Sequence, residues 1–401
     1  MKNILYISLS GMTEALGRSQ VFEYLIDLSK TNKIYLISFE RQNDKNNLSM
    51  IQDLAKYHNI EWTYFNYTNK FGIFSTIIQI AQAVIYASKV IKKNKVDIIH
   101  SRSMIPATMA IILRKIHKIK HLFDIRGFVF DEKVDSGRLK KNTLMYKILL
   151  KLENTLYLNS DYIVTLTKKS KEIISLKYKI KEVNISVIPT CANKEIFKCM
   201  NKEDTLAFKL NEGFHLDDVI LIHSGAVTNS YDFDSEVKVF EKVNKLDNRI
   251  KFMVVNQGQH EYIKKVFLKY HIPENNYKIK TSTFENMHKY LNISNASIFF
   301  IPPTYSKQAS TPTKFAENLL CHLPSITNLG VGDMDYYMMN YNVGSIFDLN
   351  DCKNDINNVV SEIMKVLLFN NTYDFDILFH KYFDKVNAVN DYDKIYAKLN
   401  K

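Results

Sequence analysis

The stretch "VDIIHSRSMIPATMAIILRKIHKIKHLFDI", Val96 to Ile125, contains two short apolar runs separated by a longer helical segment. The runs, 96–101 and 120–125, are nearly continuous in apolar residues, as strands buried on both faces of a sheet should be. A strand, a crossover helix and a second strand form a βαβ unit, which is typical of a parallel sheet. This stretch therefore predicts an α/β fold.

The same alternation continues along the whole chain. It predicts two α/β domains with doubly wound, Rossmann-like sheets in tandem, joined near "PTCANKEIFKCMNKED". We expect an N-terminal domain over 1–192, a C-terminal domain over 193–375, and a helix over 376–401 that packs back on the first domain. The predicted strands are 3–8, 33–38, 96–101, 120–125, 161–167 and 185–190, then 219–225, 251–256, 276–282, 296–302, 324–329 and 344–349.

Length and composition agree with this organisation. A chain of 401 residues is too long for one compact core of ordinary size, and 46% of it is hydrophobic. Its four cysteines are scattered without a CxxC pair, which argues against a zinc site or a disulfide framework. The first residues read as a strand rather than as a signal peptide. We therefore expect a cytoplasmic protein.

The charge is unevenly distributed along the chain. Residues 1–190 carry 30 Lys and Arg against 16 Asp and Glu, whereas the remaining residues carry 24 against 26. A basic first half suits a phosphorylated acceptor or the anionic inner face of a membrane, and a merely solvated lysine-rich surface is the alternative. Nucleic acid is not expected as a partner, because no aromatic-basic motif accompanies the charge.

The segment "STPTKFAENLLCHLP", 310–324, predicts a helix with an unusual start. Thr311 is a plausible N-cap, and Pro312 suits the first helical position. Lys314 lies in the first turn, where the helix dipole favours acids. A lysine there makes sense if the side chain and the helix N-terminus bind the same anion, such as a diphosphate. Glu317, one turn deeper, can accept hydroxyl protons, as from a ribose. A surface ion pair between the two side chains remains the alternative.

Several stretches resemble one bacterial subgroup of the retaining glycosyltransferases of family 4, which have the GT-B fold. The resemblance implies two domains facing each other across a cleft, a nucleotide-sugar donor on the C-terminal domain and an acceptor mainly on the N-terminal one. It runs in order from the first strand to about residue 340. The matching blocks are "SGMTEALGRSQVFEYLIDLSK", "DIIHSRSMIPATMA", "FDIRGFVFDEKVDSGR", "DYIVTLTKKSKEII", "VIPTCANKEIF" and "FFIPPTYSKQASTPTKFAENLLCHLPSITNLGVGDMDYY".

The family's donor contacts carry over to named positions. By resemblance, Glu317 holds the donor ribose and Lys314 contacts the donor phosphate, while the helix start presents backbone N–H groups. Gly17, in the loop after the first strand, matches a glycine near the donor phosphates, with a simple turn as its alternative. The remaining predicted donor-side residues are Gly225, Gln257, Thr283, Thr311 and Thr313.

Three departures from the family pattern bear on catalysis. The first of the family's two acids would lie eight residues before Glu317, where this chain has Ala309. The loop "SGAVTNSYDFD", 224–234, lacks the cations that clamp the diphosphate in many relatives. Arg126 stands where many relatives have a histidine, and an arginine stabilises phosphate but does not act as a base.

The resemblance also implies a front-side route, in which the leaving phosphate helps to take the acceptor proton. We expect Arg126 and Lys314 to stabilise the leaving diphosphate, without a metal or other cofactor. Asp131 and Glu132 are candidates to orient or deprotonate the acceptor hydroxyl, or else they pair with neighbouring cations. His100 and Arg102 are acceptor-side candidates, with structural roles as their alternatives.

An uncharged stretch in the first domain, Phe71 to Ser88, is long enough to be considered as a membrane span. Glutamines and hydroxyl residues interrupt it, and it leads through "KVIKKNK" into a predicted strand. We expect a helix that is buried or faces the cleft. Contact with a membrane surface is the second possibility and a true span the third.

The leading hypothesis is a metal-independent retaining glycosyltransferase that extends a bacterial glycan, such as a lipid-linked precursor of a surface polysaccharide. A nucleotide-sugar epimerase or hydrolase, and a catalytically weak binding partner in a glycan-assembly complex, remain open. DxD pairs occur four times, but the pattern is abundant here by composition. The sequence does not reveal the donor base or sugar, the acceptor, the linkage or the oligomeric state.

Overall fold

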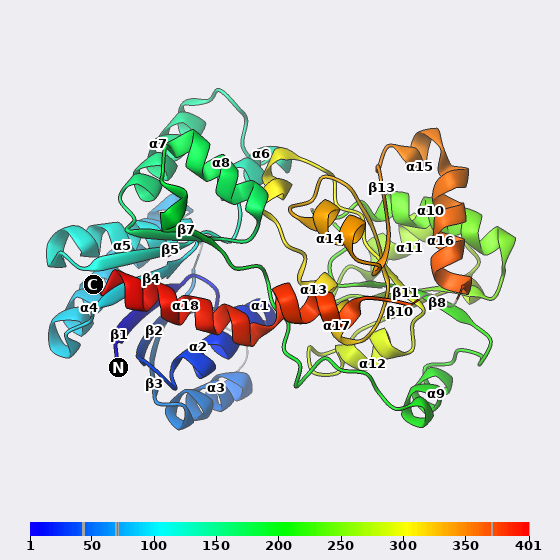
Figure 1. The fold of residues 1–401 in the computed structure, drawn as a ribbon, viewed down its shortest axis with the longest axis horizontal. Helices are drawn as coiled ribbons and strands as arrows, with labels where there is room; N and C mark the ends of the chain where they lie inside the picture. Colours follow the sequence, from blue (N-terminus) through cyan, green and yellow to red (C-terminus); the bar gives the residue numbers. More distant parts are fainter. Residues whose placement is uncertain (42–44, 69, 71, 229, 370–371, 401) are drawn as a thin grey trace. The chain divides into compact units, whose positions relative to one another are not determined.

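The computed structural model describes residues 1–401 except 42–44, 69, 71, 229, 370–371 and 401 (Figure 1). The chain divides into two compact units. The N-terminal unit comprises Met1–Pro189 and Lys385–Lys401, and the C-terminal unit comprises Thr190–Asp384. Each is an α/β unit built on one parallel sheet, so the predicted fold class is confirmed.

The sheet of the N-terminal unit has seven parallel strands in the order β3-β2-β1-β4-β5-β6-β7. The chain moves outward from β1 in one direction and then returns to the other side, as in a doubly wound fold. The register places Tyr6 opposite His100 and Arg102 opposite Asp124, so these polar side chains gather at the carboxyl ends of the strands. The strands are β1 Asn3–Ser8, β2 Lys33–Glu40, β3 Ile60–Asn66, β4 Ile98–Arg102, β5 Lys120–Asp124, β6 Tyr162–Thr165 and β7 Ile185–Val187.

Helices cover both faces of this sheet. Parallel crossovers are almost always right-handed, so the helices after β3, β4, β5 and β6 share one face, and those after β1 and β2 share the other. The C-terminal helix α18 lies next to α2 (Figure 1), where Lys385 forms ion pairs with Glu23 and Asp27. The helices are α1 Ala15–Gly17, a π-helix Arg18–Phe22, α2 Glu23–Leu28, α3 Lys45–Tyr57, α4 Ile73–Asn94, α5 Met104–His117, α6 Val129–Asp135, α7 Leu144–Leu158, α8 Lys168–Tyr178, a 3₁₀ turn Glu182–Asn184 and α18 Lys385–Leu399.

The sheet of the C-terminal unit has six parallel strands in the order β10-β9-β8-β11-β12-β13. They are β8 Val219–Ser224, β9 Ile250–Val255, β10 Tyr277–Lys280, β11 Ala296–Ile298, β12 Ser325–Asn328 and β13 Gly344–Phe347. The helices are α9 Lys202–Asn211, α10 Phe233–Leu246, α11 His260–Lys269, α12 Met287–Asn292, α13 Thr313–Leu320, α14 Met334–Asn340, α15 Asp351–Asn354, α16 Ile356–Leu368 and α17 Phe375–Leu378, with 3₁₀ turns Glu274–Asn276 and Tyr305–Ala309 and a π-helix Phe379–Phe383.

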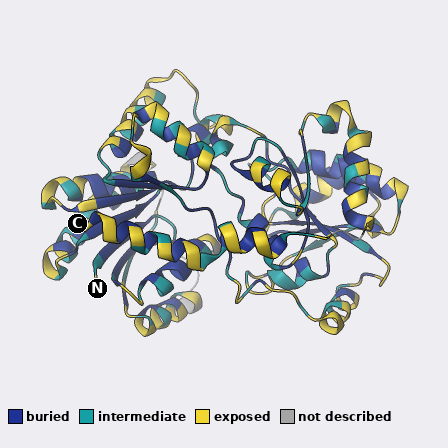
Figure 2. Ribbon diagram, viewed as in Figure 1, coloured by how far each residue is buried: buried dark blue, intermediate teal, exposed yellow. Residues whose placement is uncertain are grey.

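Each unit has its own core, because the strands are buried and the outer helix faces are exposed (Figure 2). In the N-terminal unit, Leu5, Ile37 and Ile99 pack beneath α4 and α5. In the C-terminal unit, Phe252 and Phe267 meet edge to face with ring centroids 5.6 Å apart. Burial of the continuous apolar runs therefore accounts for the strand pattern in the sequence.

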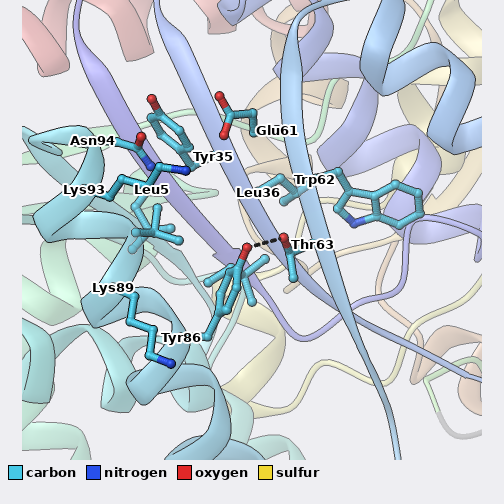
Figure 3. A pocket seen from close by; sticks show the side chains of 12 residues that line it. Leu5, Tyr35, Leu36, Glu61, Trp62, Thr63, Tyr86, Lys89, Lys93 and Asn94 are labelled. Atoms are coloured by element: carbon cyan, nitrogen blue, oxygen red, sulfur yellow. Dashed lines mark hydrogen bonds between the residues drawn. The ribbon is translucent and has the colours of Figure 1, made fainter.

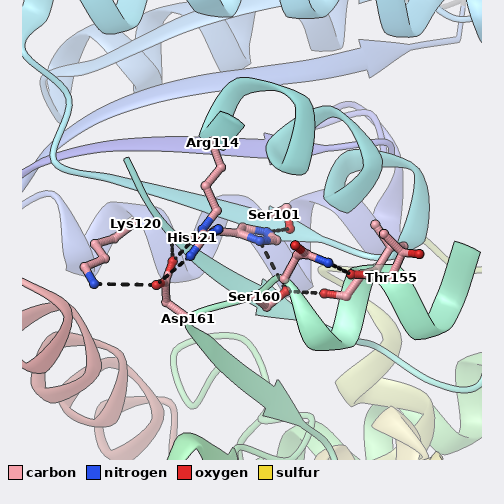
Figure 4. Close-up of polar contacts among 9 residues, drawn as sticks. Ser101, Arg114, Lys120, His121, Thr155, Ser160 and Asp161 are labelled. Atoms are coloured by element: carbon pink, nitrogen blue, oxygen red, sulfur yellow. Dashed lines mark hydrogen bonds and ion pairs between the residues drawn. The ribbon is translucent and has the colours of Figure 1, made fainter. Parts of the chain in front are cut away.

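A polar network ties helices α5 and α7 to strand β5 (Figure 4). Arg114 forms two hydrogen bonds to Asp161, at 2.9 and 3.1 Å, and the same carboxylate accepts the backbone N–H of His121 at 2.9 Å. The imidazole lies between Ser101 and Ser160, at 2.7 and 3.2 Å. Burial lowers the pKa of His121 to about 3, which favours the neutral imidazole.

Twelve predicted strands occur where the sequence placed them, and β3 is a seventh strand in the first sheet that the analysis missed. The C-terminal region predicted as one helix over 376–401 instead consists of α17, a π-helix and α18, and the described part of it from Lys385 onward belongs to the N-terminal unit. The helix expected at Phe71–Ser88 is buried on one side only, where Ala83 and Ala87 enter the core, and whether it faces a cleft stays a prediction. Phe71 lies outside the described residues, and within α4 the side chains of Phe74 and Ile85 are 71% and 61% exposed.

Candidate functional site

Lys314 is the most unusual charge in the C-terminal unit. It lies in the first turn of α13 and is only 7% exposed, yet its ammonium makes no hydrogen bond with any part of the chain that the structure describes. The ammonium instead lies over two aromatic rings, 3.8 Å from the centroid of Tyr231 and 5.5 Å from that of Phe299. Burial lowers its pKa to about 8, although Glu236 and Glu317 act in the opposite direction.

Glu317 follows one turn later on α13. Among the described residues, its carboxylate has no ion pair within 4.0 Å and no hydrogen bond. The surface ion pair with Lys314 that the spacing allowed is therefore not formed. Burial raises the pKa of Glu317 to about 7, and the charge of Lys314 only partly offsets this effect. Helix α13 thus holds a cation and a carboxyl group that the protein itself does not neutralise.

The loop after β8 forms one side of the space around Lys314. Gly225 has a φ of +93°, which favours glycine, and a Cβ at this position would lie 4.0 Å from the Lys314 ammonium. His223 fixes the start of the loop, because its Nδ1 contacts Glu236 at 2.7 Å and its Nε2 contacts the Ala226 carbonyl at 2.9 Å. Gly225 therefore lies next to the buried cation, and its predicted role in letting the donor approach the backbone stays a prediction. Asn229, in the same loop, lies outside the described residues.

Asn256 joins the ends of three neighbouring strands. Its side chain donates to the Gly225 carbonyl at 2.8 Å, and its backbone N–H donates to the Lys280 carbonyl at 2.9 Å. The predicted donor residue Gln257 is exposed and donates to the Ser282 carbonyl at 2.9 Å, beside the exposed Thr283. Gly225, Gln257 and Thr283 therefore lie at adjacent strand ends on the edge where α/β sheets bind ligands.

The start of α13 differs by one residue from the prediction. Pro312 is the N-cap, and Thr313 is the first helical residue. Thr311 therefore precedes the cap, and the N-cap Pro312 has no side-chain acceptor with which to cap the helix. The uncapped helix start lies next to the buried ammonium of Lys314. Together they provide a positive site with the backbone N–H groups and the dipole aligned for an anion.

Lys307 supplies a cation that sequence reasoning missed. Its ammonium donates to the hydroxyl of Ser230 at 3.1 Å, in the loop that lacks cations of its own. The lysine belongs to the 3₁₀ turn Tyr305–Ala309, and its carbonyl accepts the N–H of Gly332 at 2.9 Å. Ala309 ends the same turn and is fully buried. The turn therefore brings a positive charge to the loop. At the position of the family's first acid, Ala309 is packed in the protein interior.

Three predicted residues of the N-terminal unit converge on Asp124, which is fully buried at the end of β5. Arg102 and Arg126 form ion pairs with its two carboxylate oxygens at 3.5 and 3.6 Å, and His100 approaches at 3.8 Å. Although burial opposes ionisation, Arg126 leads the charges that hold the pKa of Asp124 well below its usual range. The charge of Arg126 is thus engaged within the protein.

Helix α18 covers this cluster. The hydroxyl of Tyr392 donates to Asp124 at 3.2 Å, and the hydroxyl of Tyr396 lies 2.7 Å from Nδ1 of His100. His100 and Arg102 are 1% and 6% exposed, so the side chains predicted on the acceptor side have protein partners here. Sequence analysis expected the C-terminal helix to fold back on the first domain. It did not predict that the tyrosines of this helix contact the buried charged side chains.

Gly17 is the last residue of the short helix α1 and packs against the loop after β1. A Cβ on Gly17 would come 1.8 Å from the Gly11 carbonyl oxygen, so no other residue fits without movement. Glu40 organises the loop, because its carboxylate accepts the N–H groups of Met12 at 2.7 Å and Thr13 at 3.1 Å. Sequence analysis did not single out Glu40. The glycine therefore has a packing role that does not depend on a ligand.

Asp131 and Glu132 lie on α6, after the turn that contains Gly127. Asp131 is buried and accepts a hydrogen bond from the hydroxyl of Tyr146 at 3.4 Å, and burial raises its pKa. Glu132 turns back toward the turn, since a Cβ on Gly127 would lie 3.3 Å from its carboxylate. These contacts do not test whether either carboxylate orients or deprotonates the acceptor hydroxyl, so both roles stay predictions.

A pocket of about 420 Å³ lies in the N-terminal unit between α4 and strands β2 and β3 (Figure 3). Lys89 and Lys93 line it from the helix, and Tyr86 forms a 2.7 Å hydrogen bond with Thr63 at its wall. None of its lining residues is a predicted site residue. Within the described part of the chain, no group of three His, Cys, Asp or Glu side chains is arranged to hold a metal.

A comparison with known proteins gives the glycosyltransferase family that the sequence resembles. Residues 56–195, about a third of the chain, match the family model of Glycosyltransferase Family 4, and none of the curated proteins matches the chain. The segment lies almost wholly in the N-terminal unit. Together with the architecture, this match identifies the chain as a glycosyltransferase.

Solved structures of GT-B glycosyltransferases superpose along nearly the whole chain. HepE from Anabaena, in complex with UDP and glucose, has a TM-score of 0.68 at 13% identity and covers 99% of this chain and 100% of its own. Sucrose-phosphate synthase from Thermosynechococcus elongatus has a TM-score of 0.72 at 13% identity, covering 100% and 99%. The lipopolysaccharide outer core galactosyltransferase WaaB has a TM-score of 0.63 at 13% identity, covering 99% and 100%. At these identities the likeness shows the GT-B fold.

Proposed function

We propose that this chain, a glycosyltransferase of the GT-B fold, binds a nucleotide-sugar in its C-terminal unit and transfers the sugar with retention of configuration. The proposal rests chiefly on the buried ammonium of Lys314, which has no hydrogen-bond partner among the described residues and lies one turn from the carboxylate of Glu317. The ammonium binds the donor diphosphate, and the carboxylate accepts hydrogen bonds from the ribose hydroxyls. A nucleotide-sugar carries both a diphosphate and a ribose on one molecule.

Burying an ion without a partner is strongly unfavourable, and proteins ordinarily pair such groups. Phosphate oxygens at the uncapped start of α13 neutralise Lys314 and receive the helix N–H groups at the same time. Lys307, from the preceding turn, adds a second positive charge on the side of the loop after β8. Donor binding thus completes a site that the free protein leaves unsatisfied.

The proposed transfer follows a front-side route. The bond between the anomeric carbon and the phosphate oxygen breaks, the bond to the acceptor oxygen forms on the same face, and the acceptor proton passes to the leaving phosphate. Charge then accumulates on the diphosphate, where Lys314, Lys307 and the start of α13 stabilise it. We place this role on Lys314 rather than on Arg126, because Asp124 engages the arginine, whereas the Lys314 ammonium has no hydrogen-bond partner among the described residues. No metal is required by this scheme.

We further propose a cytoplasmic enzyme that extends a lipid-linked glycan of a bacterial surface polysaccharide or glycoconjugate. Support comes from the family match in the N-terminal unit and from neighbours described as binding UDP-glucose or as a lipopolysaccharide galactosyltransferase. Asp131 and Glu132 are the candidates to orient the acceptor hydroxyl. An epimerase or hydrolase would change the donor without an acceptor, and a binding protein would leave it intact.

The proposal is tested by thermal unfolding with a panel of UDP-, GDP-, ADP- and dTDP-sugars. A ligand that binds only the folded state raises the apparent stability by mass action, so the preferred donor should stand out. Incubation of that donor with a glycan acceptor and excess chelator should then yield a product with the donor's anomeric configuration. Conversion of the donor without acceptor, inversion, or loss of turnover in chelator would each contradict a part of the proposal.

A further inference from the structure

Helix α4 presents an apolar stripe to solvent. Phe74, Ile77, Ile78 and Ile85 are 71%, 56%, 55% and 61% exposed. Their spacings of three, four and seven residues place them on one face of the helix. A surface helix of a globular protein ordinarily turns such a stripe toward the core, so the orientation of α4 needs an explanation from outside this chain.

The inward side of α4 carries several small and polar residues. Ala83 and Ala87 are fully buried against the sheet, and Gln79 is 5% exposed and donates to the Thr68 carbonyl at 2.6 Å. Near the end of the helix, Ser88 lies 2.7 Å from the imidazole of His117 on α5. Large apolar side chains therefore lie on both sides of α4, since Ile80, Val84 and Ile91 pack toward the core while the stripe faces solvent.

The helix is long and apolar enough to cross a membrane by length and composition. Its inward side, however, is part of the core of the N-terminal unit, where Ala83, Ala87 and Ile91 pack with Leu5 and Ile99. A membrane-spanning position would remove this helix from the sheet that it covers. The outward apolar stripe instead suits a helix that lies in the plane of the membrane–water interface.

Cations outnumber acids around the stripe, although Glu61 on β3 lines the same pocket as Lys89. From residue 62 to residue 123 the chain has ten Lys and Arg and a single acid, Asp97. Lys89 and Lys92 are exposed and lie on the same face of the helix, immediately beyond Ile85. On the neighbouring helix α5, Ile112 and Ile116 are exposed and are followed by further basic residues. Apolar side chains flanked by cations, with almost no acids, complement an anionic lipid surface.

We propose that the α4 surface, made of Phe74, Ile77, Ile78, Ile85, Lys89 and Lys92, docks the protein peripherally on an anionic membrane. The four apolar side chains enter the interfacial region, and the two lysines contact lipid phosphates. Docking would bring the enzyme to a lipid-linked acceptor, so the biological purpose rests on the proposed function, although the binding itself does not.

The test is co-sedimentation of the full-length protein with vesicles. We expect binding to vesicles with about one-third phosphatidylglycerol and binding at least about tenfold weaker to pure phosphatidylcholine. The double variant Phe74→Ser with Ile78→Ser should lower the affinity at least about tenfold, since each removes exposed apolar area. Lys89→Gln and Lys92→Gln should each lower it about fivefold and flatten its dependence on salt.

A matched control comes from the C-terminal unit, where Leu246 and Leu268 are 67% and 74% exposed. The double variant Leu246→Ser with Leu268→Ser should bind the vesicles as the wild type does. Absence of binding to anionic vesicles, or equal loss in this control, would overturn the proposal. So would a dimer that dissociates in the Phe74 and Ile78 variant, because the partner would then be a second copy.

The donor-induced thermal shift separates this proposal from the proposed function. It should be unchanged in the variants of the α4 surface. Vesicle binding without a donor shift would contradict the assigned enzyme function alone. A donor shift without vesicle binding would contradict membrane docking alone.

Discussion

The N-terminal unit and the C-terminal unit both have charged side chains near the carboxyl ends of their parallel strands. The two units differ in whether those charges have hydrogen-bond or ion-pair partners within the protein. In the N-terminal unit, Asp124 lies among Arg102, Arg126 and His100, and Tyr392 donates to it. In the C-terminal unit, Lys314 and Glu317 have no hydrogen bond or ion pair to the described residues.

This difference separates a charge that stabilises a fold from one that is available to a ligand. A paired buried charge is costly to disturb, because removal of one partner leaves the other uncompensated. An unpaired buried charge lowers the stability of the free protein, and a complementary ligand removes the penalty. Sequence analysis grouped Arg126 with Lys314, whereas Arg126 pairs with Asp124 and the Lys314 ammonium has no hydrogen-bond partner among the described residues.

Asp124→Asn should have the largest effect, because it leaves two buried arginines without their carboxylate. We expect the free energy of unfolding of the N-terminal unit to fall by about 3–5 kcal/mol, measured by denaturant titration. Asp247→Asn provides the control, since its partner Arg249 is half exposed and the pair lies at the surface. A variant of Asp124 as stable as that control would refute the structural reading of the cluster.

Glu317→Ala should lower kcat/KM for the nucleotide-sugar about 100-fold, because the ribose hydroxyls lose a charged acceptor. The unfolding free energy should change little, since no protein group loses a partner. Glu261→Ala, on an exposed carboxylate of the same unit, should leave both quantities unchanged. Near wild-type turnover of the Glu317 variant would remove this residue from the donor site.

The affinity for the donor should depend on pH with a maximum between about pH 7 and pH 8. Below the pKa of Glu317, about 7, the protonated carboxyl no longer accepts both ribose hydroxyls, so binding weakens as pH falls. Above the pKa of Lys314, about 8, the neutral amine no longer attracts phosphate, so binding weakens as pH rises. Titration calorimetry across this range tests the expectation.

Two variants assign the limbs of that profile. In Glu317→Gln, donor binding should no longer weaken as pH falls but should still weaken as pH rises. In Lys314→Met, which binds the donor more weakly overall, binding should weaken only as pH falls. A profile that neither substitution alters would show that other groups control the binding.

Lys307→Met should have the smallest effect on the donor site, about a tenfold loss of donor affinity, because it removes one charge-assisted contact to phosphate. Lys264→Met is a matched control, since this lysine is exposed on α11 of the same unit. Equal affinities for the two variants would mean that Lys307 only fixes the loop through Ser230.

The architecture was predictable because buried parallel strands leave a strong local pattern, and all twelve predicted strands are present. The strand β3 was missed, although "IEWTYFN" is rich in aromatic and β-branched residues. It lies at the edge of the sheet and is largely half-buried, so its apolar pattern is weak. The orientation of α4 was also missed, since composition alone does not say which side of a helix meets the sheet.

The candidate site was predictable only in part. The spacing of Lys314 and Glu317 suggested a shared ligand, and the structure adds that neither has a partner among the described residues. The pairing of Arg126 with Asp124 depends on strand register and on α18, which no local pattern encodes. Lys307 reaches a loop 77 positions earlier in the chain, so its contribution required the fold.

The most direct test of the account is the stability of Lys314→Met with and without the preferred nucleotide-sugar. Methionine retains the apolar volume and removes a buried ammonium that has no hydrogen-bond partner. We predict that the free variant is at least as stable as the wild type toward denaturant and that the donor no longer stabilises it. A free variant destabilised as strongly as Asp124→Asn, with the donor-induced stabilisation intact, would contradict the assignment of Lys314 as a ligand-binding charge.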